Sequence, residues 1–154
     1  MPTPTPTIPT WYSCGPVGGW GGNPFSDPPD LTIKVITVSW GEYVDRLIVT
    51  YSDGTKQLHG GQGGDHQYSI DFADDEYITK LSGRCGDYID LLMISTNKRD
   101  YPPFGGDPIW PSGGNPFSLP LPGPSIPQYF FGRCQSFIDA IGINGVWNMP
   151  KPST

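Results

Sequence analysis

The stretch Gly18–Ser26 (GGWGGNPFS) returns twice later in the chain. It recurs as Gly60–Ser69 (GGQGGDHQYS) and, split by an insertion, as Gly105–Gly106 followed by Gly113–Ser118 (GGNPFS). A repeat at a near-constant period indicates a repetitive architecture and takes precedence over local patterns. The sequence therefore predicts three copies of one structural unit within its 154 residues.

Each glycine-rich turn is followed by a loop that ends in aspartate. The three loops, Gly41–Asp45 (GEYVD), Gly86–Asp90 (GDYID) and Gln135–Asp139 (QSFID), align without a gap, and each runs into an apolar stretch. From the last glycine of each turn to its aspartate the distances are 23 residues (22 to 45), 26 (64 to 90) and 25 (114 to 139). Three copies of one loop pair suggest three copies of one site.

Short apolar runs between turn signals predict strands. Glycine and proline make up 40 of 154 residues, but the many aromatic and β-branched residues favour a packed body, so these residues are read mainly as turns. No stretch of a dozen residues keeps a helical apolar spacing without Gly or Pro. The expected strands are residues 31–40, 46–51, 68–72, 77–81, 91–96, 126–131 and 140–147.

The predicted fold is all-β, with three small antiparallel sheets around a pseudo-threefold axis. Periodicity alone leaves a β-trefoil open as the competing threefold shape. Residues 1–12 are rich in Pro and Thr and are expected to form a flexible tail, residues 13–150 the folded domain, and residues 151–154 a C-terminal tail.

Charge and composition exclude several classes of partner. The net charge is −6, and nine Lys and Arg residues form no basic cluster, so nucleic acid is not expected to bind. No apolar run approaches the roughly 20 residues of a membrane span, and no signal peptide is visible. We therefore expect no membrane insertion, and either a cytoplasmic location or secretion by a non-classical route. Homo-oligomerisation is left open.

Three cysteines cannot all pair within one chain. Cys85 and Cys134 occupy equivalent repeat positions, which a threefold arrangement would hold apart. Free, partly buried thiols in a reducing compartment are the favoured interpretation, and a Cys14–Cys134 bridge is the alternative.

The two kinds of loop, repeated three times, resemble those of the jacalin-related lectins over roughly residues 13–149. This resemblance implies the β-prism I fold. Because all three copies are present, the chain is most similar to members of the family in which every sheet carries a sugar site. It also implies that each site joins an aspartate loop to the glycine turn of the neighbouring sheet. Asp45 would pair with the turn ending at Gly64, Asp90 with that ending at Gly114, and Asp139 with that ending at Gly22.

The resemblance implies a non-catalytic lectin for mannose- or glucose-containing oligosaccharides and glycoproteins, with no cofactor and no metal. An ionised carboxylate accepts several hydrogen bonds, which suits adjacent sugar hydroxyls. A side chain at the turn glycines would keep a hydroxyl from the main chain. Aromatic rings would add a planar wall. The expected site residues are the acceptors Asp45, Asp90 and Asp139; the turn residues Gly22, Gly64 and Gly114; the wall residues Tyr43, Tyr88 and Phe137; and the neighbours Glu42, Val44, Asp87, Ser136 and Ile138.

The three copies are not equivalent in sequence. Gln135, Ser136 and Phe137 depart from the pattern of the other two loops, and the insertion 107–112 splits the turn that serves Asp90. We expect this insertion either to reshape the site or to add a Trp110 contact to a second sugar. The Asp45 copy is the most regular. The other tryptophans, including Trp20, are interpreted as structural or rim residues.

Other readings of these residues are weaker. His59 and His66 flank the turn near Asp65, but two histidines without Cys or a further spaced carboxylate make a poor metal site. A glycoside hydrolase would need a pair of carboxylates across the scissile bond. Glu42 with Asp45 and Asp87 with Asp90 are close in sequence, but the third copy has Ser136 in place of the acid. A structural or partner-binding prism without sugar binding remains the alternative.

Overall fold

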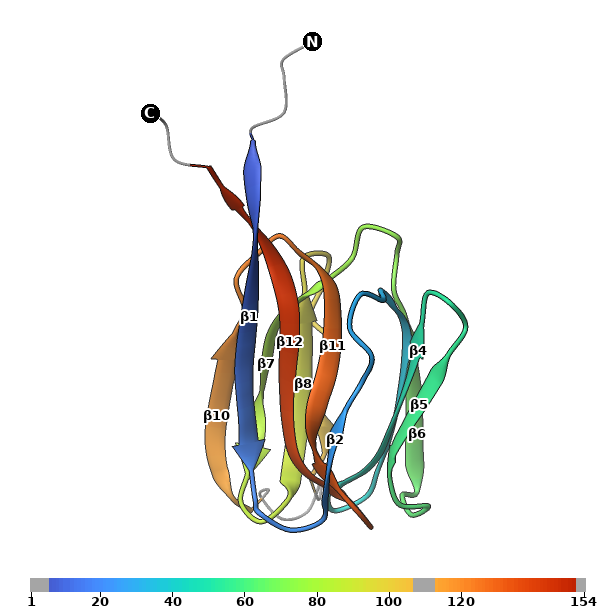
Figure 1. Ribbon diagram of the computed structural model, residues 1–154. Coiled ribbons are helices and arrows are strands. Elements are labelled where there is room, and N and C mark those ends of the chain that lie inside the picture. The colour runs from blue at the N-terminus through green and yellow to red at the C-terminus, as the bar shows by residue number, and fades with distance from the viewer. Residues whose placement is uncertain (1–5, 107–112, 152–154) are drawn as a thin grey trace.

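The computed structural model describes residues 6–106 and 113–151, and the described chain is all strands and loops (Figure 1). Its regular elements are β1 (Thr7–Gly18), β2 (Asn23–Ser26), β3 (Ile33–Trp40), β4 (Val44–Tyr51), β5 (Lys56–Gly60), β6 (His66–Asp71), β7 (Ile78–Cys85), β8 (Ile89–Thr96), β9 (Phe104–Gly105), β10 (Asn115–Pro120), β11 (Ser125–Cys134) and β12 (Ile138–Pro150). The all-β prediction is therefore confirmed. The sequence missed β5 and β9 and gave no separate signal for β1, β2 and β10.

The strands form three separate four-stranded antiparallel sheets. Sheet A has the order β1-β12-β11-β2, sheet B the order β5-β4-β3-β6 and sheet C the order β10-β7-β8-β9. In each sheet the central hairpin (β11–β12, β3–β4 or β7–β8) is flanked by two outer strands. Among the described residues the three sheets share no strand and none closes on itself, which excludes the closed barrel of a β-trefoil and leaves the three-sided prism.

Both ends of the chain meet in sheet A. β1 pairs with β12 from Thr7, opposite Pro150, to Gly18, opposite Ala140, and the two strands run side by side through the length of the molecule (Figure 1). The predicted tail of residues 1–12 is therefore too long, because residues 7–12 belong to β1. Prolines are tolerated there because β1 is an edge strand, where a missing N–H does not break the ladder.

Alternating side chains of the central strands build the core. β4 and β8 have the same pattern of burial, with every second residue after the aspartate pointing inward. In β4 these are Leu47, Val49 and Tyr51, and in β8 Leu92 and Ile94, all at most 1% exposed. They pack in one cluster with Phe130, Ile141 and Ile143 of sheet A. The period-two pattern thus buries one face of every sheet against the other two.

A buried polar group joins sheet A to sheet B. Asp27 follows β2, and its carboxylate accepts a hydrogen bond from the Tyr51 hydroxyl and lies 2.7 Å from Nε2 of His59.

The His59 ring stacks on Phe25 at 3.7 Å between centroids, while His66 stacks on Trp40. The two histidines therefore have separate structural contacts. No group of three or more potential metal ligands occurs among the described residues.

Gln128 joins sheet A to sheet C. Its amide accepts from the Ile78 main-chain N–H at 2.8 Å and donates to the Ile78 carbonyl at 2.7 Å. The side chain thus satisfies both main-chain groups of a residue in β7, as a neighbouring strand would. Such full pairing is what allows a polar group to be buried at small net free-energy cost.

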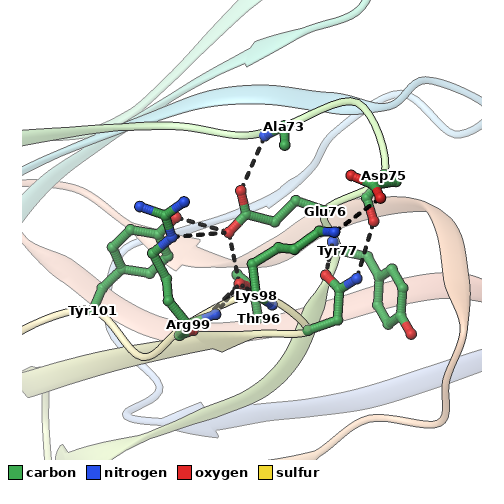
Figure 2. Close-up of polar contacts among 9 residues, drawn as sticks. Ala73, Asp75, Glu76, Tyr77, Thr96, Lys98, Arg99 and Tyr101 are labelled. Atoms are coloured by element: carbon green, nitrogen blue, oxygen red, sulfur yellow. Dashed lines mark hydrogen bonds and ion pairs between the residues drawn. The ribbon is translucent and has the colours of Figure 1, made fainter.

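Glu76 anchors the loop that leads from sheet B to sheet C (Figure 2). Its carboxylate accepts hydrogen bonds from the Ala73 amide at 3.0 Å, the Thr96 hydroxyl at 2.6 Å and the Tyr101 hydroxyl at 2.8 Å. Burial alone would raise the pKa of Glu76, but these bonds and the nearby Arg99 hold it below its usual range. Burial is the main cause that raises the pKa of Tyr101 to about 12, and the hydrogen bond to the Glu76 carboxylate is the second.

The three cysteines are half-buried and unpaired. Burial raises the pKa of each thiol. The Cys14–Cys134 bridge is therefore not formed in this structure. No helix in the described ranges has the length and apolar character needed to cross a membrane.

We predict that Glu76→Gln lowers the free energy of unfolding by about 1–3 kcal/mol at neutral pH, because a neutral amide cannot accept all three hydrogen bonds. The pKa of Glu76 is lowered in the folded state, so its contribution is complete above about pH 4.3 and is lost as pH falls through the folded pKa. Urea unfolding at several pH values from 7 to 3 should show that the difference in the free energy of unfolding between this variant and wild type becomes smaller as pH falls. Asp74→Asn, an exposed substitution in the same loop, is the control; a difference that does not change with pH would contradict this assignment.

Candidate functional site

The three aspartates each occupy the extra position of a β-bulge. In sheet B, Ser39 pairs with Arg46 and Trp40 pairs with Val44, so Asp45 has no partner across the ladder. The same shift leaves Asp90 without a partner in β8 and Asp139 without one in β12. A bulge bends the strand and re-aims the extra side chain. The three bulges lie at the beginning of β4, β8 and β12, at the end of the prism where β1 and β7 end (Figure 1).

The hairpin loops that precede the aspartates close in the same way. The main-chain N–H at the first loop position donates to the carbonyl two residues on: Gly41 to Tyr43, Gly86 to Tyr88 and Gln135 to Phe137, each at 3.0 Å. The replacement of glycine by Gln135 is therefore harmless. Gly41 and Gly86 are not in the left-handed region, and a Cβ there would meet nothing closer than 3.7 Å.

Each carboxylate faces the glycine turn with which the family resemblance pairs it. A Cβ on Gly64 would lie 3.3 Å from Asp45 Oδ2, one on Gly114 3.1 Å from Asp90 Oδ1, and one on Gly22 2.7 Å from Asp139 Oδ1. The predicted pairing of loops is therefore confirmed.

The expectation that the turn comes from a neighbouring sheet is wrong. The turn at Gly64 joins β5 to β6, the two outer strands of the sheet that holds Asp45. The turns of sheets A and C likewise join outer strands, β1 to β2 and β9 to β10. Each turn thus crosses the end of its own sheet, over the central hairpin, and meets the bulged aspartate there.

Glycine is required in these turns for two reasons. Gly22, Gly64 and Gly114 have φ angles of 71°, 100° and 77°, in the left-handed region that side chains disfavour. A Cβ on Gly22 or Gly114 would also lie 2.7 Å from the carbonyl oxygen of Cys134 or Cys85. The turn can therefore approach the carboxylate closely only with glycine at this position.

Two of the turns also hold the main chain of their aspartates. The Gly61 N–H donates to the Asp45 carbonyl at 2.9 Å, and the Gly19 N–H donates to the Asp139 carbonyl at 2.8 Å. The bulged residue is thus fixed through its own carbonyl, whereas its side chain takes no part in the sheet. Bulge and turn form one unit.

Contacts between sheets link the three units in a ring. Gly19 of the sheet A turn lies against the Asp87 carbonyl in the sheet C loop, and Gly61 of sheet B against the Ser136 carbonyl in the sheet A loop. The Gly106 N–H of sheet C donates to the Glu42 carbonyl of the sheet B loop at 3.2 Å. The predicted neighbours Glu42, Asp87 and Ser136 therefore lie beside the next sheet's turn.

The three predicted wall residues meet one another. The rings of Tyr43, Tyr88 and Phe137 lie with centroids 5.1, 5.2 and 4.9 Å apart, tilted or edge to face. Since one ring comes from each sheet, the cluster sits between the three sites at the pseudo-threefold axis. The sequence analysis expected these rings to line the sugar. In the structure they contact one another, in the tilted and edge-to-face geometries that aromatic rings favour.

Two other predicted residues are core residues. The side chains of Val44 and Ile138 are fully buried, as is that of Ile89 at the same position in sheet C. Bulging sends the aspartate side chain toward the turn while its predecessor points inward.

Two arginines, not recognised from the sequence as site residues, brace the turns. Arg133 donates from Nε to the Gly21 carbonyl at 3.0 Å and from Nη2 to the Gly22 carbonyl at 2.9 Å. Arg84 makes the same pair of bonds to Gly113 and Gly114, at 3.3 and 2.7 Å. Sheet B has Ser39 at this position. The signal was present in the sequence as Gly-Arg-Cys before two of the three loops.

Burial disfavours the ionised form of all three carboxylates. Asp45, Asp90 and Asp139 are 6%, 7% and 4% exposed, and burial raises the pKa of each. Arg84 and Arg133 lower the pKa of Asp90 and Asp139, whereas Asp65 raises that of Asp45 further. Among the described residues, Asp139 Oδ1 has no hydrogen-bond partner although it is buried. Such a group is expensive to keep unless a ligand supplies a donor.

The insertion 107–112 with Trp110 lies outside the described residues. The expectation that it reshapes the Asp90 site therefore stays a prediction. On the far side of the gap, Gly113 and Gly114 face Asp90 as their counterparts face Asp45 and Asp139.

We predict that Asp139→Asn stabilises the fold at neutral pH. The pKa of Asp139 is raised by burial, so the penalty of its ionised form is complete above the folded pKa and disappears as pH falls from there toward about pH 3.9. The melting temperature should rise by roughly 2–4 °C for each kcal/mol of penalty removed, and the gain should vanish in acid.

Asp53→Asn is the matched control. Asp53 is exposed in the β4–β5 turn, and its hydrogen bonds with Thr55 lower its pKa, so this substitution should not stabilise. A destabilising effect of Asp139→Asn at neutral pH would show that its carboxylate serves the fold.

Comparison with known proteins identifies the family. Residues 14–144 match the jacalin-like lectin domain. The chain is 31% identical over 145 residues to a mannose/glucose-specific lectin of Parkia platycephala, covering 85% of this chain and 31% of that protein. Banana lectin (Malaysian) superposes with a TM-score of 0.77 at 34% identity, covering 92% of this chain and 100% of the other.

A mannose-specific jacalin-related lectin from Morus nigra, solved in complex with mannose, gives a TM-score of 0.75 at 30% identity, covering 94% of this chain and 98% of the other. The three sheets are thus those of the β-prism I fold. This chain belongs to the jacalin-like lectin domain family.

Proposed function

We propose that the protein is a non-catalytic lectin that binds mannose- or glucose-containing glycans, with one site at the end of each sheet. The observation that carries the proposal is the threefold meeting of a buried, bulged carboxylate with a glycine turn. Asp45, Asp90 and Asp139 are held this way in all three sheets.

The chemistry of this unit suits a sugar. An ionised carboxylate has only acceptor sites, so it accepts hydrogen bonds from two adjacent hydroxyls, and such charge-assisted bonds are worth about 1.5–3 kcal/mol. Main-chain amides of the loops, such as those of Asp87 and Tyr88, serve as donors to the hydroxyl oxygens. The glycine turn leaves room for a hydroxyl because Gly22, Gly64 and Gly114 carry no Cβ.

The named relatives support the class of sugar. The Parkia protein is a mannose/glucose-specific lectin and the Morus structure contains mannose. Their family is one of lectins, which supports a binding protein over an enzyme. We therefore extend mannose or glucose recognition to this chain, without a cofactor.

The arrangement of the sites favours branched glycans. All three sites lie around the cluster of Tyr43, Tyr88 and Phe137 at one end of the prism. Linked sites that can be engaged together gain about 10² to 10⁴ in avidity without any new contact. Glycoproteins with several mannose-terminated branches are therefore the proposed partners.

We predict that the combined substitution Asp45→Asn, Asp90→Asn and Asp139→Asn weakens binding to immobilised mannan at least 100-fold. The amide keeps the size of the carboxylate but removes its charge and replaces one acceptor by a donor. Surface plasmon resonance gives the affinity, and thermal unfolding verifies that the variant folds.

The matched control removes three carboxylates at the opposite end of the prism, by Asp53→Asn, Asp74→Asn and Asp100→Asn. This control should bind mannan as wild type does. Mannan binding by the site variant, or equal loss in both variants, would contradict the proposal, and a wild-type protein that binds no mannose- or glucose-terminated glycan on an array would favour the partner-binding alternative.

A further inference from the structure

Trp20 is the most exposed large apolar side chain in the described ranges. It is 92% exposed, on the turn between Gly18 and Gly22 that faces Asp139. An isolated apolar side chain on a surface needs no explanation. This one stands on a segment that the structure holds firmly beside a candidate sugar site.

The turn is fixed on both sides of Trp20. Before it, the Gly19 N–H donates to the Asp139 carbonyl at 2.8 Å, and the Gly19 Cα lies against the Asp87 carbonyl of sheet C. After it, Arg133 binds the carbonyls of Gly21 and Gly22, and a Cβ on Gly21 would lie 2.8 Å from Asp139 Oδ2. The main chain of Trp20 is therefore fixed while its indole remains in solvent.

The equivalent positions of the other turns differ. The sheet B turn has Gln62 between Gly61 and Gly63, and the sheet C turn has the insertion 107–112. The core of the site is repeated three times, but this position is not. Variation at one position beside an otherwise repeated site is expected of a residue that tunes specificity.

We propose that Trp20 is the platform for a second sugar at the Asp139 site, so that this site prefers an oligosaccharide to a single mannose. The inference rests on the proposed lectin function and deepens it. The terminal sugar hydrogen-bonds to Asp139, and the next pyranose lays its C–H face on the indole, which offers a large rigid apolar surface with few rotamers to restrict.

The neighbouring sheet supplies a polar edge to this subsite. Asp87 is exposed in the loop whose main chain touches Gly19, so an acidic residue of sheet C adjoins the turn that carries the indole. An apolar face beside a carboxylate matches a pyranose, which has an apolar face and hydroxyls around its rim. At the Asp45 site the corresponding neighbour is Ser136 and the turn residue is Gln62, so the turn there carries no aromatic side chain and the neighbour no carboxylate.

The test isolates one site. In a protein carrying Asp45→Asn and Asp90→Asn, titration calorimetry compares methyl α-mannopyranoside with mannotriose before and after Trp20→Ala. We expect mannotriose binding to weaken about five- to tenfold and binding of the monosaccharide to change less than twofold. Trp20→Gln, which installs the residue of the sheet B turn, should behave like Trp20→Ala. Gln62→Ala is the matched control and should change neither affinity.

The remaining outcomes overturn the inference. An equal loss for both ligands would make Trp20 part of the first-sugar site or of the fold, and no loss for either would make it an uninvolved rim residue. If the double variant binds neither ligand while wild type binds both, the Asp139 site is inactive and only this inference fails. If wild type also binds neither, the proposed function fails with it. The exposure of Trp20 predicts an unchanged melting temperature, which excludes misfolding as a cause.

Discussion

The rest of the structure depends on one constraint: at the end of each central hairpin, a β-bulge turns an aspartate out of the ladder and against a glycine turn. The bulge makes Asp45, Asp90 and Asp139 free of the sheet. The turn can reach the carboxylate because Gly22, Gly64 and Gly114 adopt φ angles and close contacts that a side chain would prevent. The same turns touch the next sheet's loop, so forming one unit helps to position its neighbour.

Polar groups have opposite effects at the two ends of the prism. At the site end, three carboxylates are buried with raised pKa values, and Asp139 Oδ1 lacks a partner. Away from it, Glu76 is buried with three hydrogen-bond donors and a lowered pKa. A buried carboxylate with satisfied oxygens stabilises a fold, whereas one with an unpaired oxygen destabilises it. Glu76 therefore serves to hold the sheets together, whereas the three aspartates are the carboxylates that we propose bind a ligand.

The repeated motifs predicted the all-β class and the threefold arrangement, and the resemblance to the lectin family implied the pairing of each aspartate with its glycine turn. Other features were not visible in a linear pattern. Each turn belongs to the same sheet as its aspartate because it joins the two outer strands of that sheet. The order of the motifs along the chain does not show whether the turn lies in the same sheet or in the next one. Tyr43, Tyr88 and Phe137 turn toward the axis, which depends on how the sheets are placed around it. Prolines concealed β1, since an edge strand tolerates them.

The most direct test of the account is an NMR titration of the ¹⁵N-labelled protein with methyl α-mannopyranoside. The account predicts that perturbed amides lie in the three aspartate loops and in the glycine turns at residues 19–22, 61–64 and 113–114, and that the Tyr51–Lys56 and Phe72–Tyr77 segments at the opposite end are unaffected. Perturbations confined to the opposite end, or none at saturating sugar, would contradict the claim that the bulged aspartate and the glycine turn together form the sugar site.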